Sequence, residues 1–236
     1  MTGPAWLGIG AQRSGTTWFV DLLTQHPQVG LGTNGKKEQH RLHKVADGLL
    51  PAEEYLDLFP GDQIARGEWT PHYLRHPTAP PAAARLVPED TPVLVLLRDP
   101  VDRFRSAMRL AGTRVAQNAP AQPWPYPVPM TVQTWTGFYA DQLAAWRAAV
   151  GRDRLVVMVY EQVRRDPVAA VEAVWSRLGL AAAPLSGLQE ASISSSQTPW
   201  DWPDGLRESL QAMYRPQRDR LESEWGLDLS DWTSLG

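Results

Sequence analysis

The sequence contains no cysteine. Disulfide bonds, zinc sites built on thiolates and cysteine nucleophiles are therefore excluded. No apolar run approaches the roughly 20 residues that a helix needs to cross a bilayer, so we expect no membrane insertion. The opening MTGPAWLGIG lacks the basic segment of a signal peptide, and we expect a cytoplasmic protein. A net charge of −3 argues against a surface dedicated to nucleic acid, so no nucleic-acid partner is expected.

With 236 residues, 43% of them hydrophobic, the chain can bury a substantial core. Apolar runs typical of buried strands alternate with amphipathic helical patterns. The strands are expected at residues 6–9, 28–31, 92–97 and 155–160, a strand end at 66–73, and helices at 16–23, 53–59, 79–86, 101–110, 132–150, 167–178 and 205–225, the last interrupted near Pro216. This alternation predicts an α/β fold, a single domain over residues 1–236 with a central parallel β-sheet flanked by helices.

The stretch LGIGAQRSGTTW, residues 7–18, runs from a buried strand through a glycine-containing loop into a helix. Backbone N–H groups converge at such a junction, and the helix dipole adds partial positive charge there. Arg13 contributes a cation, and Ser14, Thr16 and Thr17 contribute hydroxyl groups. The loop is predicted to bind a phosphate. A tight turn capped by Ser14 is the alternative.

The spacing of Gly10 and Gly15 matches a Walker A loop, but one residue of that motif is missing. Walker A reads GxxxxGK[ST], with a lysine directly after the second glycine. Thr16 occupies the lysine position here, and the cation lies inside the loop at Arg13. A standard P-loop NTPase is therefore not expected.

The run RDP that begins at Arg98 repeats the pattern of a buried strand, a break and a helix start. Ser106 lies eight residues further on, about two helical turns along. An arginine at a strand end and a serine on the following helix can hold a second phosphate. Pairing of Arg98 with Asp99 or Asp102 is the alternative.

The segments GAQRSGTTW and RDPVDRFRS resemble the two nucleotide motifs of sulfotransferases that use 3′-phosphoadenosine 5′-phosphosulfate (PAPS). The chain is most similar to the carbohydrate, heparan-sulfate-type branch of that family and to its bacterial relatives. The resemblance implies a P-loop-like core, PAPS as the donor and adenosine 3′,5′-bisphosphate (PAP) as the product. It implies that Arg98 and Ser106 bind the 3′-phosphate. The residues implied on the 5′ side are Arg13, Ser14, Gly15, Thr16, Thr17 and Trp18.

The resemblance extends over most of the chain. The segment Lys37-Glu38-Gln39-His40 is similar to the KExH segment of the same branch, whose glutamate is the proposed base. It implies Glu38 as the general base, His40 as the second candidate or as a partner that orients Glu38, and Lys37 at the transferring sulfonate. Without the resemblance, the residues favour a surface carboxylate paired with Lys36 or Lys37.

The acceptor is expected to be a small molecule or a glycan. The segment GEWTP, residues 67–71, resembles GEKTP of the same branch, with Trp69 where a lysine is usual, which argues against an acidic polysaccharide. Aromatic faces suit a sugar ring, an aryl group or a lipophilic compound. The expected acceptor wall consists of Trp69, His72, Trp124, Tyr126, Trp200 and Trp202. Residues 111–131 are proline-rich, and we expect them to form an irregular acceptor-side loop or lid.

These residues imply an O-sulfotransferase that moves a sulfuryl group from PAPS to a hydroxyl group by in-line displacement. Arg13 and the helix N-terminus would neutralise the 5′-phosphate, while Glu38 takes the hydroxyl proton. No metal is required in this scheme. The remaining histidines lack ligand-like spacing and are interpreted as structural or surface residues: His26, His43, His72 and His76. The alternatives are an atypical P-loop nucleotide kinase and an inactive sulfotransferase-like nucleotide-binding module. The sequence leaves the oligomeric state open.

Overall fold

The computed structural model describes residues 3–118, 127–188 and 200–236. The chain divides into two compact units, of which the first comprises residues 1–97 and 142–191 and the second residues 98–141 and 192–236. None of the described helices combines the length and the hydrophobicity that a bilayer crossing requires.

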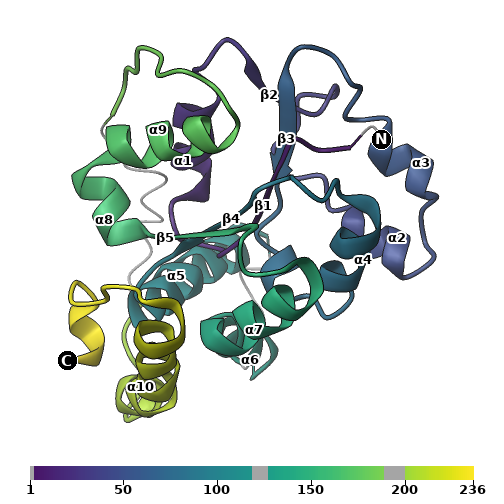
Figure 1. The fold of residues 1–236 in the computed structure, drawn as a ribbon. Helices are drawn as coiled ribbons and strands as arrows, with labels where there is room; N and C mark the ends of the chain where they lie inside the picture. Colours follow the sequence, from purple (N-terminus) through teal and green to yellow (C-terminus); the bar gives the residue numbers. More distant parts are fainter. Residues whose placement is uncertain (1–2, 119–126, 189–199) are drawn as a thin grey trace. The chain divides into compact units, whose positions relative to one another are not determined.

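The first unit is built on a five-stranded parallel β-sheet with the strand order β2-β3-β1-β4-β5 (Figure 1). Its strands are β1 (Trp6–Gly10), β2 (Val29–Leu31), β3 (Ala65–Trp69), β4 (Val93–Leu97) and β5 (Leu155–Val159). The central strands β1 and β4 are buried along their whole length, as in sheets that are covered on both faces. The predicted α/β fold with a central parallel sheet is therefore confirmed, and all five strands end at the same edge.

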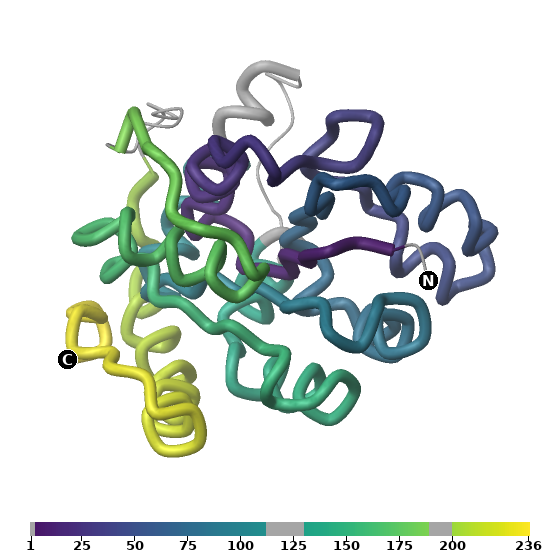
Figure 2. Tube along the Cα trace, turned by 45° about the horizontal axis from the view of Figure 1, so that its top comes forward, coloured from purple at the N-terminus to yellow at the C-terminus, as the bar shows by residue number. Residues whose placement is uncertain are grey.

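Helices follow the strands of the first unit: α1 (Thr16–Leu23), α2 (Leu42–Ala46), α3 (Ala52–Leu56), α4 (Ala79–Leu86), α8 (Tyr160–Arg165), α9 (Pro167–Arg177) and the 3₁₀ turn η1 (Tyr73–Arg75). Helices α1 and α9 contact each other and lie side by side in Figures 1 and 2. Between them and the sheet lies a core that includes Trp6, Leu94 and Phe19. The indole of Trp175 in α9 donates to the Leu23 carbonyl at 3.0 Å and joins the two helices.

Trp69, at the end of β3, belongs to this core. Its side chain is fully buried, and its ring meets Phe19 edge to face at 5.7 Å between centroids. A Cβ atom added at Gly8 of the neighbouring strand would lie 2.1 Å from the Trp69 ring. The expected place of Trp69 in an acceptor wall does not agree with this burial, because the indole fills the space between β1 and α1.

The second unit consists of helices, namely α5 (Pro100–Asn118), α6 (Pro127–Trp135), α10 (Leu206–Trp225), the 3₁₀ turn η2 (Thr233–Leu235) and the start of α7 (Tyr139–Val150), which continues into the first unit. The buried guanidinium group of Arg103 in α5 donates to the side chain of Gln133 at 2.8 Å and also to its carbonyl. The hydroxyl of Tyr214 in α10 donates to the Thr134 carbonyl at 2.9 Å. Both contacts attach neighbouring helices to α6.

Much of the stretch 111–131, expected to be irregular, is helical where it is described. Helix α5 continues to Asn118, and α6 begins at Pro127. Pro127 and Pro129 fall in the first turn of α6, where the missing N–H groups have no helical partner to lose. Trp124 and Tyr126 lie outside the described residues.

Two further helix predictions are wrong. The helix expected over residues 132–150 is divided, because α6 ends at Trp135 and α7 begins at Tyr139. The hydroxyl of Thr136 donates to the Val132 carbonyl at 2.8 Å, and the following glycine is a weak helix former. Helix α10 is continuous through Pro216, and one of its faces buries Leu210, Tyr214, Gln217 and Leu221.

The substitution Gly8→Ala should lower the free energy of unfolding by about 1–3 kcal/mol, because the added methyl group overlaps the Trp69 ring. In a Trp69→Leu background the same substitution should cost less, since the smaller side chain leaves room. Urea unfolding of the wild type, both single variants and the double variant measures the two costs. Equal costs in the two backgrounds would contradict this packing.

Candidate functional site

The loop between β1 and α1 lies at the carboxyl edge of the sheet. Arg13 and Gly15 have φ angles of 68° and 79°, in the left-handed region. Among the described residues other than glycine, a positive φ occurs at Arg13 and at His40. Such turns direct backbone N–H groups toward an anion, and the first N–H groups of a helix have no partner inside it. Gly15 is the N-cap of α1 and no side chain caps this helix, so the structure does not support a turn capped by Ser14.

The loop contains a buried hydroxyl that fits a phosphate ligand. Ser14 is fully buried, and its Oγ has no hydrogen-bond partner among the described residues. The indole nitrogen of Trp18, in the first turns of α1, is buried in the same way. Buried polar groups of this kind are costly unless they are hydrogen-bonded. An oxygen of a bound phosphate group would satisfy the serine hydroxyl, so the residues present fit the nucleotide that the sequence implies.

Lys37 brings a cation to the N-terminus of α1. Its Nζ donates to Thr16 Oγ1 at 3.0 Å and to Thr17 Oγ1 at 3.1 Å, and its side chain is only 17% exposed. Thr16 stands where a Walker A loop has its lysine, so Lys37 places an ammonium group beside that position from another part of the chain. Burial lowers the pKa of Lys37, and the nearby Glu38 carboxylate partly offsets this effect.

Glu38 connects Lys37 to His40. One carboxylate oxygen, Oε1, lies 3.3 Å from Lys37 Nζ, and the other, Oε2, lies 3.0 Å from His40 Nε2. The side chains of Glu38 and His40 are 39% and 45% exposed. Glu38 thus pairs with Lys37, as the alternative reading of the sequence expected. Because Lys37 also contacts α1, this ion pair places the carboxylate next to the predicted phosphate loop.

The carboxyl group of Glu68 lies at the centre of a buried hydrogen-bond network behind this segment. Its Oε2 accepts from Thr70 Oγ1 at 2.6 Å and from the Gln39 backbone N–H at 3.1 Å, while its Oε1 accepts from the Tyr73 hydroxyl at 2.9 Å. Complete burial raises the pKa of Glu68 to about 7, although these hydrogen bonds act in the opposite direction. Glu68 is therefore close to its ionisation midpoint at neutral pH.

This network fixes the backbone that follows Glu38. Thr70 Oγ1 and the Tyr73 hydroxyl accept hydrogen bonds of 3.0 to 3.2 Å from four successive backbone N–H groups, those of Gln39, His40, Arg41 and Leu42. The Lys37 carbonyl in turn accepts from the Trp69 N–H at 2.9 Å. The segment is thereby held against the end of β3, with the Lys37 ammonium group at α1 and the Glu38 carboxylate beside it.

Three histidines come together beside His40, although the sequence analysis found no ligand-like spacing among them. The rings of His43, His72 and His76 contact one another, and the His72 ring lies 6.4 Å from that of His40. Burial lowers the pKa of His72 to about 4, and the positive charge of Arg75 adds to this effect. The half-buried His72 is thus part of a histidine cluster, and its contact with an acceptor stays a prediction.

The residues expected at the 3′-phosphate belong to the second unit. Arg98 follows β4 directly in the chain, and its carbonyl accepts from the Tyr139 hydroxyl at 3.1 Å. The next residue, Asp99, accepts from two N–H groups of the first turn of α5, at 3.0 and 3.3 Å, and from the backbone and hydroxyl of Ser234. Ser106 lies on α5. The phosphate-binding roles of Arg98 and Ser106 stay predictions.

Two tryptophans of the expected acceptor wall also lie in the second unit. Trp202 stacks on Phe104 at 5.9 Å between ring centroids, and Trp200 meets both rings at an angle. These rings form an aromatic cluster on α5, and an acceptor-binding role for them stays a prediction.

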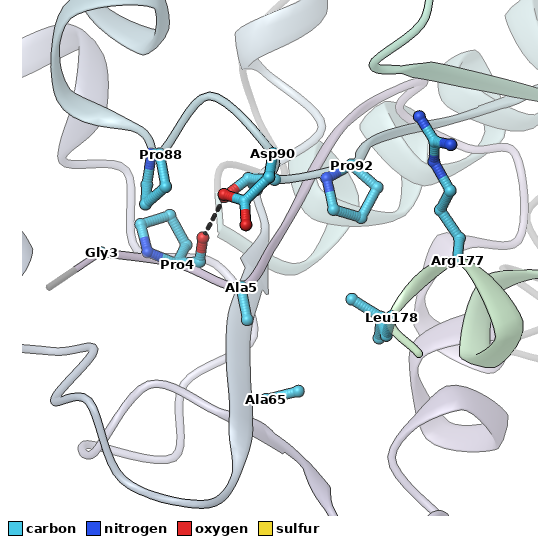
Figure 3. Close-up of a pocket in the computed structure, with 10 residues that line it drawn as sticks. Gly3, Pro4, Ala5, Ala65, Pro88, Asp90, Pro92, Arg177 and Leu178 are labelled. Atoms are coloured by element: carbon cyan, nitrogen blue, oxygen red, sulfur yellow. Dashed lines mark hydrogen bonds between the residues drawn. The ribbon is translucent and has the colours of Figure 1, made fainter. Parts of the chain in front are cut away.

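A pocket of about 330 Å³ lies at the opposite edge of the sheet, where β1, β3 and β4 begin (Figure 3). At this edge, Thr91 Oγ1 donates to the Pro4 carbonyl at 2.7 Å. The residues that line the pocket are Gly3, Pro4, Ala5, Ala65, Pro88, Asp90, Thr91, Pro92, Arg177 and Leu178. None of the site residues predicted from the sequence lines this pocket, so it is separate from the loop that precedes α1.

A family model described as a sulfotransferase domain matches residues 5–195. The chain belongs to the sulfotransferase family. A sulfotransferase from Alicyclobacillus acidocaldarius has a similar structure, with 26% identity, a TM-score of 0.74 and coverage of 99% of this chain and 100% of that one. Mouse sulfotransferase SULT7A1, solved in complex with PAP, shares the fold at 12% identity with a TM-score of 0.53, covering 96% of this chain and 90% of that one.

The mouse bifunctional heparan sulfate N-deacetylase/N-sulfotransferase 4 is 26% identical to this sulfotransferase over 198 residues. The match covers 75% of this chain and 22% of the mouse protein, so it spans about a fifth of that relative's length. The predicted family and its P-loop-like fold are confirmed by these comparisons. They agree with sulfuryl transfer as the general activity.

The residues that hold the segment of Lys37 and Glu38 in place could not be recognised as such from the sequence. The sequence places Glu68, Thr70 and Tyr73 in the strand end predicted at residues 66–73, and the first two also in the segment that resembles GEKTP. A glutamate at the end of a buried strand was the available signal, because an interior carboxylate needs hydrogen-bond donors. Thr70 and Tyr73 lie only two and five residues after Glu68, whereas its third partner, the Gln39 backbone, lies 29 residues away and could not be identified from spacing.

We expect the free energy of unfolding of the wild type to fall, compared with that of Glu68→Gln, as the pH rises from about 4.5 to 7. The pKa of Glu68 is about 7 in the folded protein, against an ordinary value of 4.5, so the folded protein keeps a proton that the unfolded chain has released. The difference in free energy of unfolding between the wild type and Glu68→Gln should change by roughly 3 kcal/mol across this range. Urea unfolding at several pH values measures it, with exposed Glu53→Gln as the control. A difference independent of pH would contradict the buried, protonated carboxyl group.

Proposed function

We propose that this chain is a PAPS-dependent O-sulfotransferase whose acceptor is a hydroxyl group of a small molecule or a glycan. One observation carries the proposal: the Lys37 ammonium group contacts both the N-terminus of α1 and the Glu38 carboxylate. A phosphate-binding loop and a candidate base are thereby joined in one chain of hydrogen bonds. Sulfuryl transfer needs this pair of functions next to each other, and membership of the sulfotransferase family supports the assignment.

PAPS, when bound, supplies an activated sulfuryl group and leaves PAP as the product. The buried Ser14 hydroxyl and the cations Arg13 and Lys37 would neutralise its 5′ side. The full set proposed for the 5′ side is Arg13, Ser14, Gly15, Thr16, Thr17 and Trp18. Arg98 and Ser106 are proposed to hold the 3′-phosphate. The PAP complex of mouse SULT7A1, which shares the fold, supports this choice of nucleotide.

Glu38 is the proposed general base. An alcohol is a weak nucleophile at neutral pH, so its proton must be removed as the new bond forms. The Glu38 carboxylate accepts this proton, and His40, 3.0 Å from Oε2, either orients the carboxylate or takes the proton on. Lys37 remains beside the carboxylate and stabilises negative charge at the reacting end of the loop. Cationic side chains supply the charge neutralisation, so the proposed reaction needs no metal.

The acceptor class has a second candidate. The heparan sulfate relative is named as an N-sulfotransferase, which favours testing an amine as well as a hydroxyl group. Trp69 is fully buried, so its ring offers no surface to an acceptor. The lysine that is usual at this position is still absent, which argues against an acidic polysaccharide. A cytoplasmic location stays a prediction from the sequence.

Glu38→Gln should reduce sulfuryl transfer by roughly 10²–10⁴-fold while PAP affinity stays within about twofold, because the amide cannot accept the proton. Transfer from ³⁵S-labelled PAPS to 4-nitrophenol, N-acetylglucosamine and glucosamine measures this loss and separates hydroxyl from amine acceptors. The control is Glu53→Gln, an exposed carboxylate on α3 that should leave transfer unchanged. Full activity of Glu38→Gln would move the base to His40 or elsewhere.

The wild type should bind PAP at least tenfold more tightly than 5′-AMP, and Arg98→Ala should lose this preference. A guanidinium contact with a phosphate is worth roughly 10–100-fold in affinity. Isothermal titration calorimetry with both nucleotides measures the preference, and Arg105→Ala, which replaces an exposed arginine on the following helix α5, is the matched control. Equal affinities in the wild type would remove the 3′-phosphate site. Magnesium-dependent binding of ATP instead would indicate a kinase.

A further inference from the structure

His43, His72 and His76 form a compact triangle from two parts of the chain. His43 lies in α2, and His72 and His76 flank the 3₁₀ turn η1. The ring centroids are 5.3 Å apart for His43 and His72, 4.6 Å for His43 and His76, and 5.0 Å for His72 and His76. One ring nitrogen from each histidine lies within 4.8 Å of the other two.

We propose that these three histidines bind one divalent transition-metal ion, with Zn²⁺ as the expected ion. Three imidazole ligands with an open fourth position are a common arrangement around protein-bound zinc. Imidazole also suits copper and nickel, whereas Mg²⁺ and Ca²⁺ require oxygen ligands that this cluster does not supply. Nitrogens bound to one tetrahedral Zn²⁺ at about 2.1 Å lie about 3.4 Å apart. The donor atoms, now within 4.8 Å of one another, therefore need to close by up to about 1.4 Å, which rotation of half-buried side chains permits.

Two ring nitrogens support this assignment independently of the ring distances. His43 Nδ1 is buried and has no hydrogen-bond partner among the described residues, which is costly for a polar atom. His76 Nδ1 lies 3.0 Å from Thr78 Oγ1. A hydrogen bond of this kind fixes a ring and presents its second nitrogen outward, as partners of metal-binding histidines do.

The charges around the triangle select against a site for hard cations. Asp47 lies close enough to His43 to favour positive charge there, while Lys44 acts on His43, and Arg75 on His72, in the opposite sense. An ion at this position must therefore be held by its bonds to imidazole nitrogen rather than by surrounding negative charge. This environment favours Zn²⁺ over Mg²⁺ and Ca²⁺.

A bound ion would connect the segment that carries Glu38 to the segment that follows β3. His43 follows directly after residues 37–42, and His72 follows closely after Glu68 and Thr70. The Glu68 network already joins these same two segments through hydrogen bonds. The expected effect of the ion is to stabilise the packing of these two segments, and the inference does not depend on which group the protein transfers.

The test is a titration of the whole chain with Zn²⁺ after dialysis against a chelator. Competition with a chromophoric chelator should give one Zn²⁺ per chain, and Tm should rise by roughly 5–10 °C when Zn²⁺ is about 100-fold above its Kd. His43→Asn, His72→Asn and His76→Asn should each weaken binding at least tenfold. His26→Asn, which lies outside the triangle, should bind as the wild type does, and Mg²⁺ should leave Tm unchanged.

A second measurement on the wild type covers the case in which a variant does not fold. Zn²⁺ should protect His43, His72 and His76 from diethyl pyrocarbonate, as read by peptide mass spectrometry, while the more exposed His40 stays reactive. Absence of saturable Zn²⁺ binding to the folded wild type would overturn the proposal. Binding retained by all three variants, or protection that does not follow the triangle, would overturn it as well.

Discussion

The candidate site depends on the contact between the Lys37 ammonium group and the N-terminus of α1. The hydroxyl oxygens of Thr16 and Thr17 accept hydrogen bonds from Lys37 Nζ, but the ammonium group and the first turn of the helix both carry positive charge, so a nearby anion stabilises the arrangement. Glu38 provides part of the compensating charge, 3.3 Å from Lys37 Nζ. The remaining positive potential is what a phosphate or sulfonate group would neutralise. Lys37 thus lies beside the position that a lysine occupies in a Walker A loop, although it comes from a different segment, and Glu38 lies next to it.

The end of β3 supports this contact through the alternation of side chains along a strand. Successive residues point to opposite faces. Trp69 therefore enters the core against Phe19, whereas Glu68 and Thr70 reach the segment that carries Lys37 and Glu38. One strand end holds both the core of the sheet and the backbone of the candidate site. Substitutions there should affect stability and site geometry together.

Local patterns were enough to predict the parallel sheet, most strand positions and both ends of α1. Phosphate binding by the loop before α1 stays a prediction. The contact between Lys37 and Thr16 could not be predicted, because it joins residues 21 positions apart through the fold. Alternation alone did not show which face Trp69 occupies, since both faces of the sheet are covered. The clustering of His43 with His72 and His76 could not be predicted either, because tertiary packing brings these rings together and their spacing in the sequence does not show it. The uninterrupted course of α10 through Pro216 shows burial overriding local helix preference.

The most direct test of this account is a crystal structure of the protein with PAP bound. The account predicts a 5′-phosphate oxygen within about 3 Å of Lys37 Nζ and of the first backbone N–H groups of α1, with the Glu38 carboxylate beside it. It would be contradicted by a 5′-phosphate bound away from this loop, for example in the pocket at the opposite edge of the sheet, while Lys37 keeps only its threonine contacts.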